Sequence, residues 1–184
     1  MLDSRIAEVV GFWSQAGEAA WFSKNPELDA EIGRRFEQLH HAAARGELSD
    51  WAGHWQGSLA LLILLDQFPR NLFRGSAHAY ATDSLALSIA EQALKAGHDV
   101  AADARMRIFF YLPFEHSELL ENQDRCVVLC RGLDAETGGN LSEWAHVHRD
   151  IIARFGRFPH RNAALGRQST PEEVAFLAAG GFSG

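Results

Sequence analysis

The side chains best suited to chemistry gather at three places where proline and phenylalanine are neighbours. We call these the first corner (residues 66–75), the second corner (112–118) and the third corner (157–162). Together with His148 they supply thirteen candidate ligand-binding residues: Asp66, Gln67, Arg70, Asn71, Arg74, Glu115, His116, Glu118, His148, Arg157, His160, Arg161 and Asn162. Arginine forks bind carboxylate and phosphate groups through paired hydrogen bonds. The set predicts a binding module with a pocket for a small anionic molecule or a short peptide.

The same side chains could instead be structural. A proline that ends a helix leaves carbonyl groups without donors, and nearby Arg and Asn side chains can satisfy them. The helical pattern places Asp66 on an apolar face, where a charge needs a partner, and Arg70 and Arg74 are nearest in sequence. The sequence leaves two interpretations open: an ion pair that locks the corner, or an oriented carboxylate in a pocket wall.

Two histidines support a second hypothesis, a hydrolase-like or acid–base enzyme. His116 or His160 would act as the acid or base, oriented by Glu115 or Asp66. Metal and cofactor signatures are missing, because the chain has no His-Glu-x-x-His pattern, no spaced cysteine pair and no phosphate-binding loop. We therefore expect no metal and no cofactor. A third hypothesis is a structural or interaction scaffold without a pocket.

The two cysteines and the charge narrow the class of protein further. Cys126 and Cys130 lie four residues apart on a predicted helix and are expected to be small core residues. A net charge of −7 without a basic run argues against a nucleic-acid partner. The apolar run at residues 59–65 is too short to span a bilayer, and the chain opens without a signal-peptide pattern. A cytoplasmic protein without a membrane partner is expected.

The elements that must position these residues are helices, since helical periodicity dominates and no strand alternation is present. Helices are predicted over residues 4–15, 26–44, 51–68, 83–96, 103–111, 117–133, 141–155 and 171–179. These eight or nine helices, joined by short loops, favour antiparallel hairpins stacked in one domain, residues 1–184.

Two details of the helix prediction position the corners. Ser49 or Asp50 should cap the central helix, which should end at Phe68 because Pro69 disfavours helix for the residue before it. The helix after the first corner should bury Leu85, Leu87, Ile89, Ala90 and Leu94.

The corner motifs resemble those of the bacterial domain-of-unknown-function 924 family. The resemblance rests on residues 65–75 (LDQFPRNLFRG), 111–118 (YLPFEHSE), 154–162 (RFGRFPHRN) and 165–173 (LGRQSTPEE), and it covers nearly the full chain. It implies an all-helical, tetratricopeptide-like architecture. It implies no activity, so no catalytic residue is assigned through it.

Overall fold

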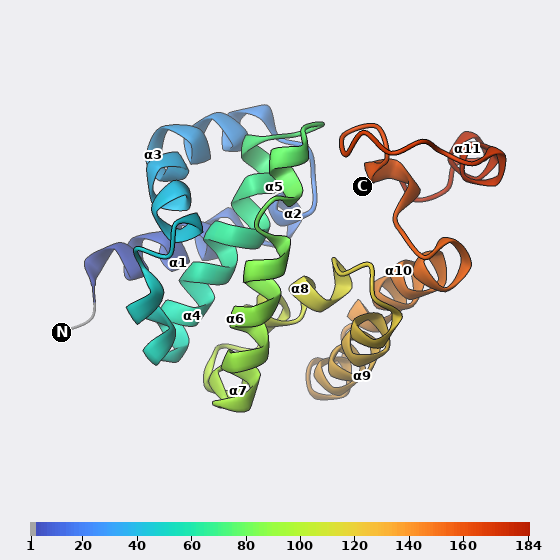
Figure 1. The fold of residues 1–184 in the computed structure, drawn as a ribbon. Coiled ribbons are helices and arrows are strands. Elements are labelled where there is room, and N and C mark those ends of the chain that lie inside the picture. Colours follow the sequence, from blue (N-terminus) through green and yellow to red (C-terminus); the bar gives the residue numbers. More distant parts are fainter. Residues whose placement is uncertain (1–2) are drawn as a thin grey trace. The chain divides into compact units, whose positions relative to one another are not determined.

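The computed structural model describes residues 3–184, and all regular structure in that range is helical (Figure 1). The α-helices are α1 (Ser4–Ala16), α2 (Glu18–Trp21), α3 (Pro26–Ala44), α4 (Trp55–Leu62), α5 (Phe68–Leu72), α6 (Asp83–Lys95), α7 (His98–Ala101), α8 (Leu112–Glu115), α9 (Leu120–Thr137), α10 (Leu141–Phe155) and α11 (Pro171–Ala178). The predicted all-helical class is confirmed. The expected number of eight or nine helices is close to the observed number, because α2, α7 and α8 are single turns of four residues and the other α-helices are longer. No helix between residues 3 and 184 is long and apolar enough to cross a bilayer.

The chain divides into two compact units, which we describe separately. The first unit contains the described residues up to Arg74 together with His78–Pro113. The second unit contains Gly75–Ala77 and Phe114–Gly184. One domain over residues 1–184 stays a prediction, as does a tetratricopeptide-like repeat.

The first unit is built around a continuous helical rod formed by α4, the π-helical segment η2 (Ile63–Gln67) and α5. Helices α1, α3 and α6 pack against this rod. Every residue from 57 to 69 is buried. The apolar pattern all round this stretch predicted such an environment.

The prediction that the helix ends before Pro69 is wrong. Phe68 has helical dihedral angles (φ −59°, ψ −36°), and its N–H donates to the carbonyl of Ile63, five residues back. This wider π turn moves the preceding carbonyl groups away from the proline ring, which would clash with them in a regular α-helix. The start of this central helix also differs from the prediction. Ser49 and Asp50 belong to the 3₁₀ turn η1 (Ser49–Gly53), and His54 caps α4 instead.

Side chains satisfy the carbonyl groups that the π turn and Pro69 leave without backbone donors. The Leu64 oxygen accepts from Nδ1 of His40 at 2.8 Å, and the Leu65 oxygen accepts from Thr82 Oγ1 at 2.5 Å. The Asp66 oxygen accepts from Arg70 Nη1 at 2.6 Å. Burial lowers the pKa of His40, so the ring stays neutral and donates from Nδ1. These bonds tie α3 and the start of α6 to the rod.

Two further helix predictions are corrected. Helix α6 buries Ala90 as predicted, together with Ala86 and Ala93, whereas Leu85 is 36% exposed and the other predicted core residues are only half-buried: Leu87, Ile89 and Leu94. Helix α6 contacts α4, and small side chains on its buried face let two helices approach closely. The predicted helix over 103–111 is reduced to the 3₁₀ turn η4 (Arg107–Phe110). The Asp103 carboxylate accepts the N–H of Arg105 at 2.9 Å, a local bond that competes with helix formation.

In the second unit α9 and α10 lie side by side as a hairpin (Figure 1). The Asp134 carboxylate accepts the N–H groups of Leu141 and Ser142, both at 2.8 Å, and so caps α10. Helix α11 begins as predicted, with Pro171 in its first turn and a capping box between Thr170 and Glu173.

We predict that Thr82→Val destabilises the protein by about 1–3 kcal/mol, because the substitution keeps the side-chain shape and leaves the buried Leu65 carbonyl without a donor. Urea unfolding followed by circular dichroism measures the change. Thr137→Val is the matched control, since Thr137 is exposed and water can replace the bonds of its hydroxyl, which donates to the Leu133 oxygen and accepts the N–H of Gly139. Equal effects from the two substitutions would contradict the role given to Thr82.

Candidate functional site

The first corner holds a buried carboxylate and its partners. Asp66 is 1% exposed, and its Oδ2 accepts from Gln67 Nε2 at 2.5 Å. Arg70 Nη1 lies 3.5 Å from Asp66 Oδ1, and the guanidinium also forms a fork with the two Asp83 oxygens at 3.0 and 3.1 Å. Burial opposes the charge of Arg70, but attraction to Asp66 and Asp83 outweighs it and raises the Arg70 pKa. The predicted Asp66–Arg70 pair is thus formed, with Asp83 as an additional partner.

The other two polar residues of this corner bind α3. Arg74 forms a fork with Asp29 at 2.7 and 2.9 Å, and Asn71 Nδ2 donates to Asp29 Oδ1 at 2.8 Å. Burial opposes ionisation of Asp29, but the hydrogen bonds from Arg74 and Asn71 prevail and lower its pKa. Arg74, the predicted alternative partner for Asp66, therefore joins the turn after α5 to α3 instead.

The second and third corners meet inside the second unit. Glu118 Oε1 accepts the N–H of Phe158 at 2.8 Å, and both Glu118 oxygens receive the Arg167 guanidinium at 2.6 and 2.9 Å. Arg161 Nη1 donates to the His116 carbonyl at 3.0 Å. Arg167 was missed as a candidate, although it lies in the motif at residues 165–173 that carried the family resemblance.

The rest of the third corner closes on the start of α11. Arg157 forms a fork with Glu173 at 2.6 and 2.8 Å, and Asn162 Nδ2 donates to Glu173 Oε2 at 3.1 Å. Glu173 is 2% exposed, and the hydrogen bonds from Arg157 lower its pKa to about 2 despite burial. Glu173 was not among the candidate site residues, because its position in the first turn of a predicted helix already explained it as part of the helix start.

The histidines lie among aromatic rings. His148 Nδ1 is 2.9 Å from the Trp144 carbonyl and 3.5 Å from Glu115 Oε1, and its ring packs on Phe182 with centroids 4.4 Å apart. The ring of His160 packs on Phe182 at 5.2 Å. The carboxylate near His148 is that of Glu115, and both residues are buried. Acid–base catalysis needs a histidine–carboxylate pair that is open to substrate. An enzyme that uses His116 or His160 stays a prediction.

The same carboxylate approaches both cysteines. Cys126 Sγ lies 3.8 Å from Cys130 Sγ and 3.9 Å from Glu115 Oε2, and all three residues are buried. Neither cysteine forms a disulfide, and both are buried, in agreement with their expected place in the core. The hydrogen bond with Cys130 and burial raise the Cys126 pKa. Sequence spacing does not predict this cluster, because Glu115 belongs to a different helix from the cysteines.

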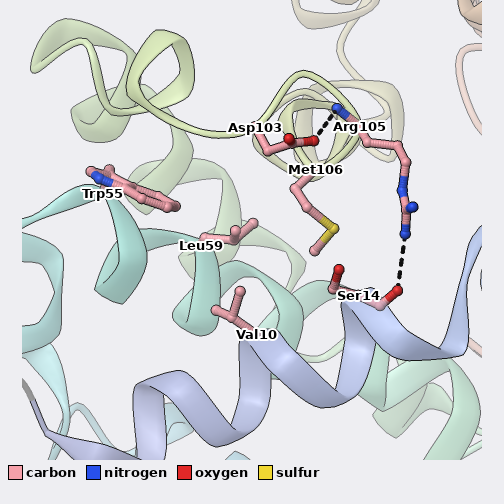
Figure 2. Close-up of a pocket in the computed structure, with 7 residues that line it drawn as sticks. All are labelled: Val10, Ser14, Trp55, Leu59, Asp103, Arg105 and Met106. Carbon is pink, nitrogen blue, oxygen red and sulfur yellow. Dashed lines mark hydrogen bonds between the residues drawn. The ribbon is translucent and has the colours of Figure 1, made fainter.

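A cavity of about 280 Å³ lies within the first unit (Figure 2). Seven residues line it: Val10 and Ser14 of α1, Trp55 and Leu59 of α4, and Asp103, Arg105 and Met106. Figure 2 shows Arg105 extending toward Ser14, whose carbonyl accepts from Nη2 at 3.0 Å. None of the thirteen candidates lines this cavity.

A second cavity of about 330 Å³ in the first unit is mostly polar. Its lining consists of Asp3, Arg5, Ile6, Glu47, Leu48, Asp50, Trp51 and His54. Arg5 is engaged by the Asp3 carboxylate and lies over the Trp51 ring, 5.5 Å from its centroid. The thirteen candidates are absent from this lining too.

Comparison with known proteins agrees with the motifs. A family model described as "Bacterial protein of unknown function (DUF924)" matches residues 9–181. The chain belongs to this family. It is also similar to the solved structure of a protein of unknown function, ATU0120, from Agrobacterium tumefaciens. The two share 48% sequence identity and a TM-score of 0.90, over 96% of this chain and 98% of the other. No curated protein matches the chain.

We predict that Arg70→Ala costs about 3 kcal/mol of stability, because it leaves buried Asp66 and its carbonyl without their cation. Arg34→Ala, which removes an exposed pair with Glu31, should cost less than about 1 kcal/mol. Chemical unfolding of both variants makes the comparison. A mild effect of Arg70→Ala, combined with lost ligand binding, would favour a pocket over a structural corner.

We predict that Glu173→Gln destabilises the protein at neutral pH and that the difference from wild type closes as the pH falls. A lowered pKa means that the wild-type carboxylate contributes stability above about pH 4.5 and loses it on approach to about pH 2. Unfolding free energies measured across this range test the sign. Glu172→Gln, at the neighbouring exposed position, should show a smaller effect. A constant difference would contradict the Arg157–Glu173 assignment.

Proposed function

We propose that this protein is a binding module for an apolar amino acid or the end of a short peptide, held in the cavity of Figure 2. The observation that carries the proposal is the lining, which combines an apolar wall with one cation and one carboxylate. Trp55, Leu59 and Met106 supply the wall. Arg105 and Asp103 supply opposite charges at one rim, as a zwitterionic ligand requires.

The corners give less support as the binding place. Arg70, Arg74 and Arg157 each hold a carboxylate through two short hydrogen bonds. An anionic ligand would have to displace Asp83, Asp29 or Glu173 and leave that carboxylate without its partner. Such displacement carries a large electrostatic cost. The corner residues therefore fit the structural interpretation better than the ligand-binding one.

Arg105 forms a weaker ion pair than these arginines. Its side chain is 51% exposed, its Nε is 3.7 Å from Glu18 Oε1, and Glu18 itself is 66% exposed. An exposed pair at that distance is weak and can yield to a ligand carboxylate. Asp103 is exposed as well, so its carboxylate can receive a ligand amino group.

Cavity size supports a small ligand. About 280 Å³ lies just below the range of roughly 300–1,000 Å³ usual for ligand sites, which suits an amino acid better than a nucleotide. The two buried cysteines, which form no disulfide, support the cytoplasmic location that we expected and propose here.

The test is a thermal-shift screen of amino acids, short peptides, simple carboxylates and phosphates, followed by calorimetric titration of the compounds that stabilise the protein. We expect apolar amino acids or peptides to bind, and Arg105→Met and Trp55→Ala each to weaken binding by at least about tenfold, roughly 1.4 kcal/mol. Arg34→Met, a surface arginine on α3 outside the cavity lining, is the control and should bind like wild type.

Two results would overturn the proposal. One is the absence of any stabilising compound in the amino-acid and peptide classes. The other is binding that survives both cavity substitutions. A ligand whose binding depends on Arg70 or Arg161 instead would return the function to the corners.

A further inference from the structure

The buried cluster of the second unit brings together side chains that ligate metals. Glu115 ends α8, whereas Cys126 and Cys130 lie one turn apart on α9. One donor atom from each residue lies within 4.8 Å of the other two. Carboxylate and thiolate groups are among the usual ligands of zinc, and thiolates select soft, thiophilic cations over magnesium or calcium.

The donor spacing fits a tetrahedral ion. Zinc–sulfur bonds of about 2.3 Å at a tetrahedral angle place two thiolate sulfurs about 3.8 Å apart. The Sγ atoms of Cys126 and Cys130 are 3.8 Å apart. With a zinc–oxygen bond of about 2.0 Å, a carboxylate oxygen would lie about 3.5 Å from each sulfur. Glu115 Oε2 is 3.9 Å from Cys126 Sγ, a few tenths of an ångström above that value, and the donor atoms of all three residues lie within 4.8 Å of one another.

We propose that Glu115, Cys126 and Cys130 form a binding site for a thiophilic divalent cation, with zinc as the natural occupant. The two cysteines are fully buried, whereas Glu115 is 6% exposed, so an ion would reach the thiols past the carboxylate. Binding releases the proton of each thiol to solvent and forms two sulfur–metal bonds and one oxygen–metal bond. Acidification therefore weakens binding.

The surroundings hold the carboxylate from its other side. His148 Nδ1 lies 3.5 Å from Glu115 Oε1, whereas the other oxygen, Oε2, is the one 3.9 Å from Cys126 Sγ, and His148 Nδ1 also lies 2.9 Å from the Trp144 carbonyl. A polar group in this place is typical of the support that metal-ligating carboxylates receive. His148 is therefore a positioning residue in this site.

The experiment uses the full chain, reduced with a reductant that does not bind metals and freed of metal by chelation in denaturant and refolding. Zinc is titrated against a chromophoric chelator, and cadmium is titrated while thiolate-to-metal charge-transfer absorption is recorded. We expect one ion per chain. Cys126→Ser and Cys130→Ser should each weaken affinity by at least about 100-fold, because loss of a ligand exceeds the 10- to 100-fold effects of supporting groups.

Glu115→Gln should retain the charge-transfer absorption and weaken zinc binding by at least about tenfold. Glu118→Gln changes a carboxylate that the Arg167 guanidinium holds, and it should bind zinc like wild type. If the serine variants fail to fold, protection of the wild-type thiols by zinc against alkylation provides the second readout. A folded wild-type chain that binds neither ion, or zinc that leaves alkylation unchanged, would overturn the proposal.

Discussion

A fully buried helix that contains a proline must find donors for the carbonyl groups before it, and the first unit is arranged around this requirement. The π turn at residues 63–67 makes room for the Pro69 ring, and it leaves three adjacent carbonyl groups for side chains. His40, Thr82 and Arg70 supply the donors from α3, from the start of α6 and from α5. Each bond satisfies a group that would otherwise cost about 1–3 kcal/mol, and it also fixes the position of a neighbouring helix.

Charged side chains also fix the positions of neighbouring segments, as the hydrogen bonds to the rod do. Arginine forks join Asp83, Asp29, Glu118 and Glu173 to segments distant in sequence. A fork constrains both the distance and the orientation of the two groups, so these pairs specify how short, irregular segments join the helices. The two sites that we propose, the cavity of Figure 2 and the cluster of Glu115 with the two cysteines, contain none of these four forks.

The sequence predicts the fold where local signals act alone. Caps, prolines and apolar spacing predict both ends of α3 and α10 to the exact residue, and they predict the first residue of α11. It fails where tertiary contacts decide. The π turn depends on donors from other helices, and the alanine face of α6 depends on how closely α4 lies. For the same reason the Asp66–Arg70 pair was predictable, whereas the approach of Glu115 to Cys126 required the fold.

The π turn also sets the phase of all that follows it along the rod. A π turn holds one residue more than an α-helical turn, and each residue of an α-helix advances the direction of its side chain by about 100°. A regular α-helix through the same residues would therefore rotate α5 by about 100° relative to its present direction. Arg70 and Arg74 would then turn away from Asp83 and Asp29. The extra residue of the π turn thus directs both guanidinium groups toward their carboxylates.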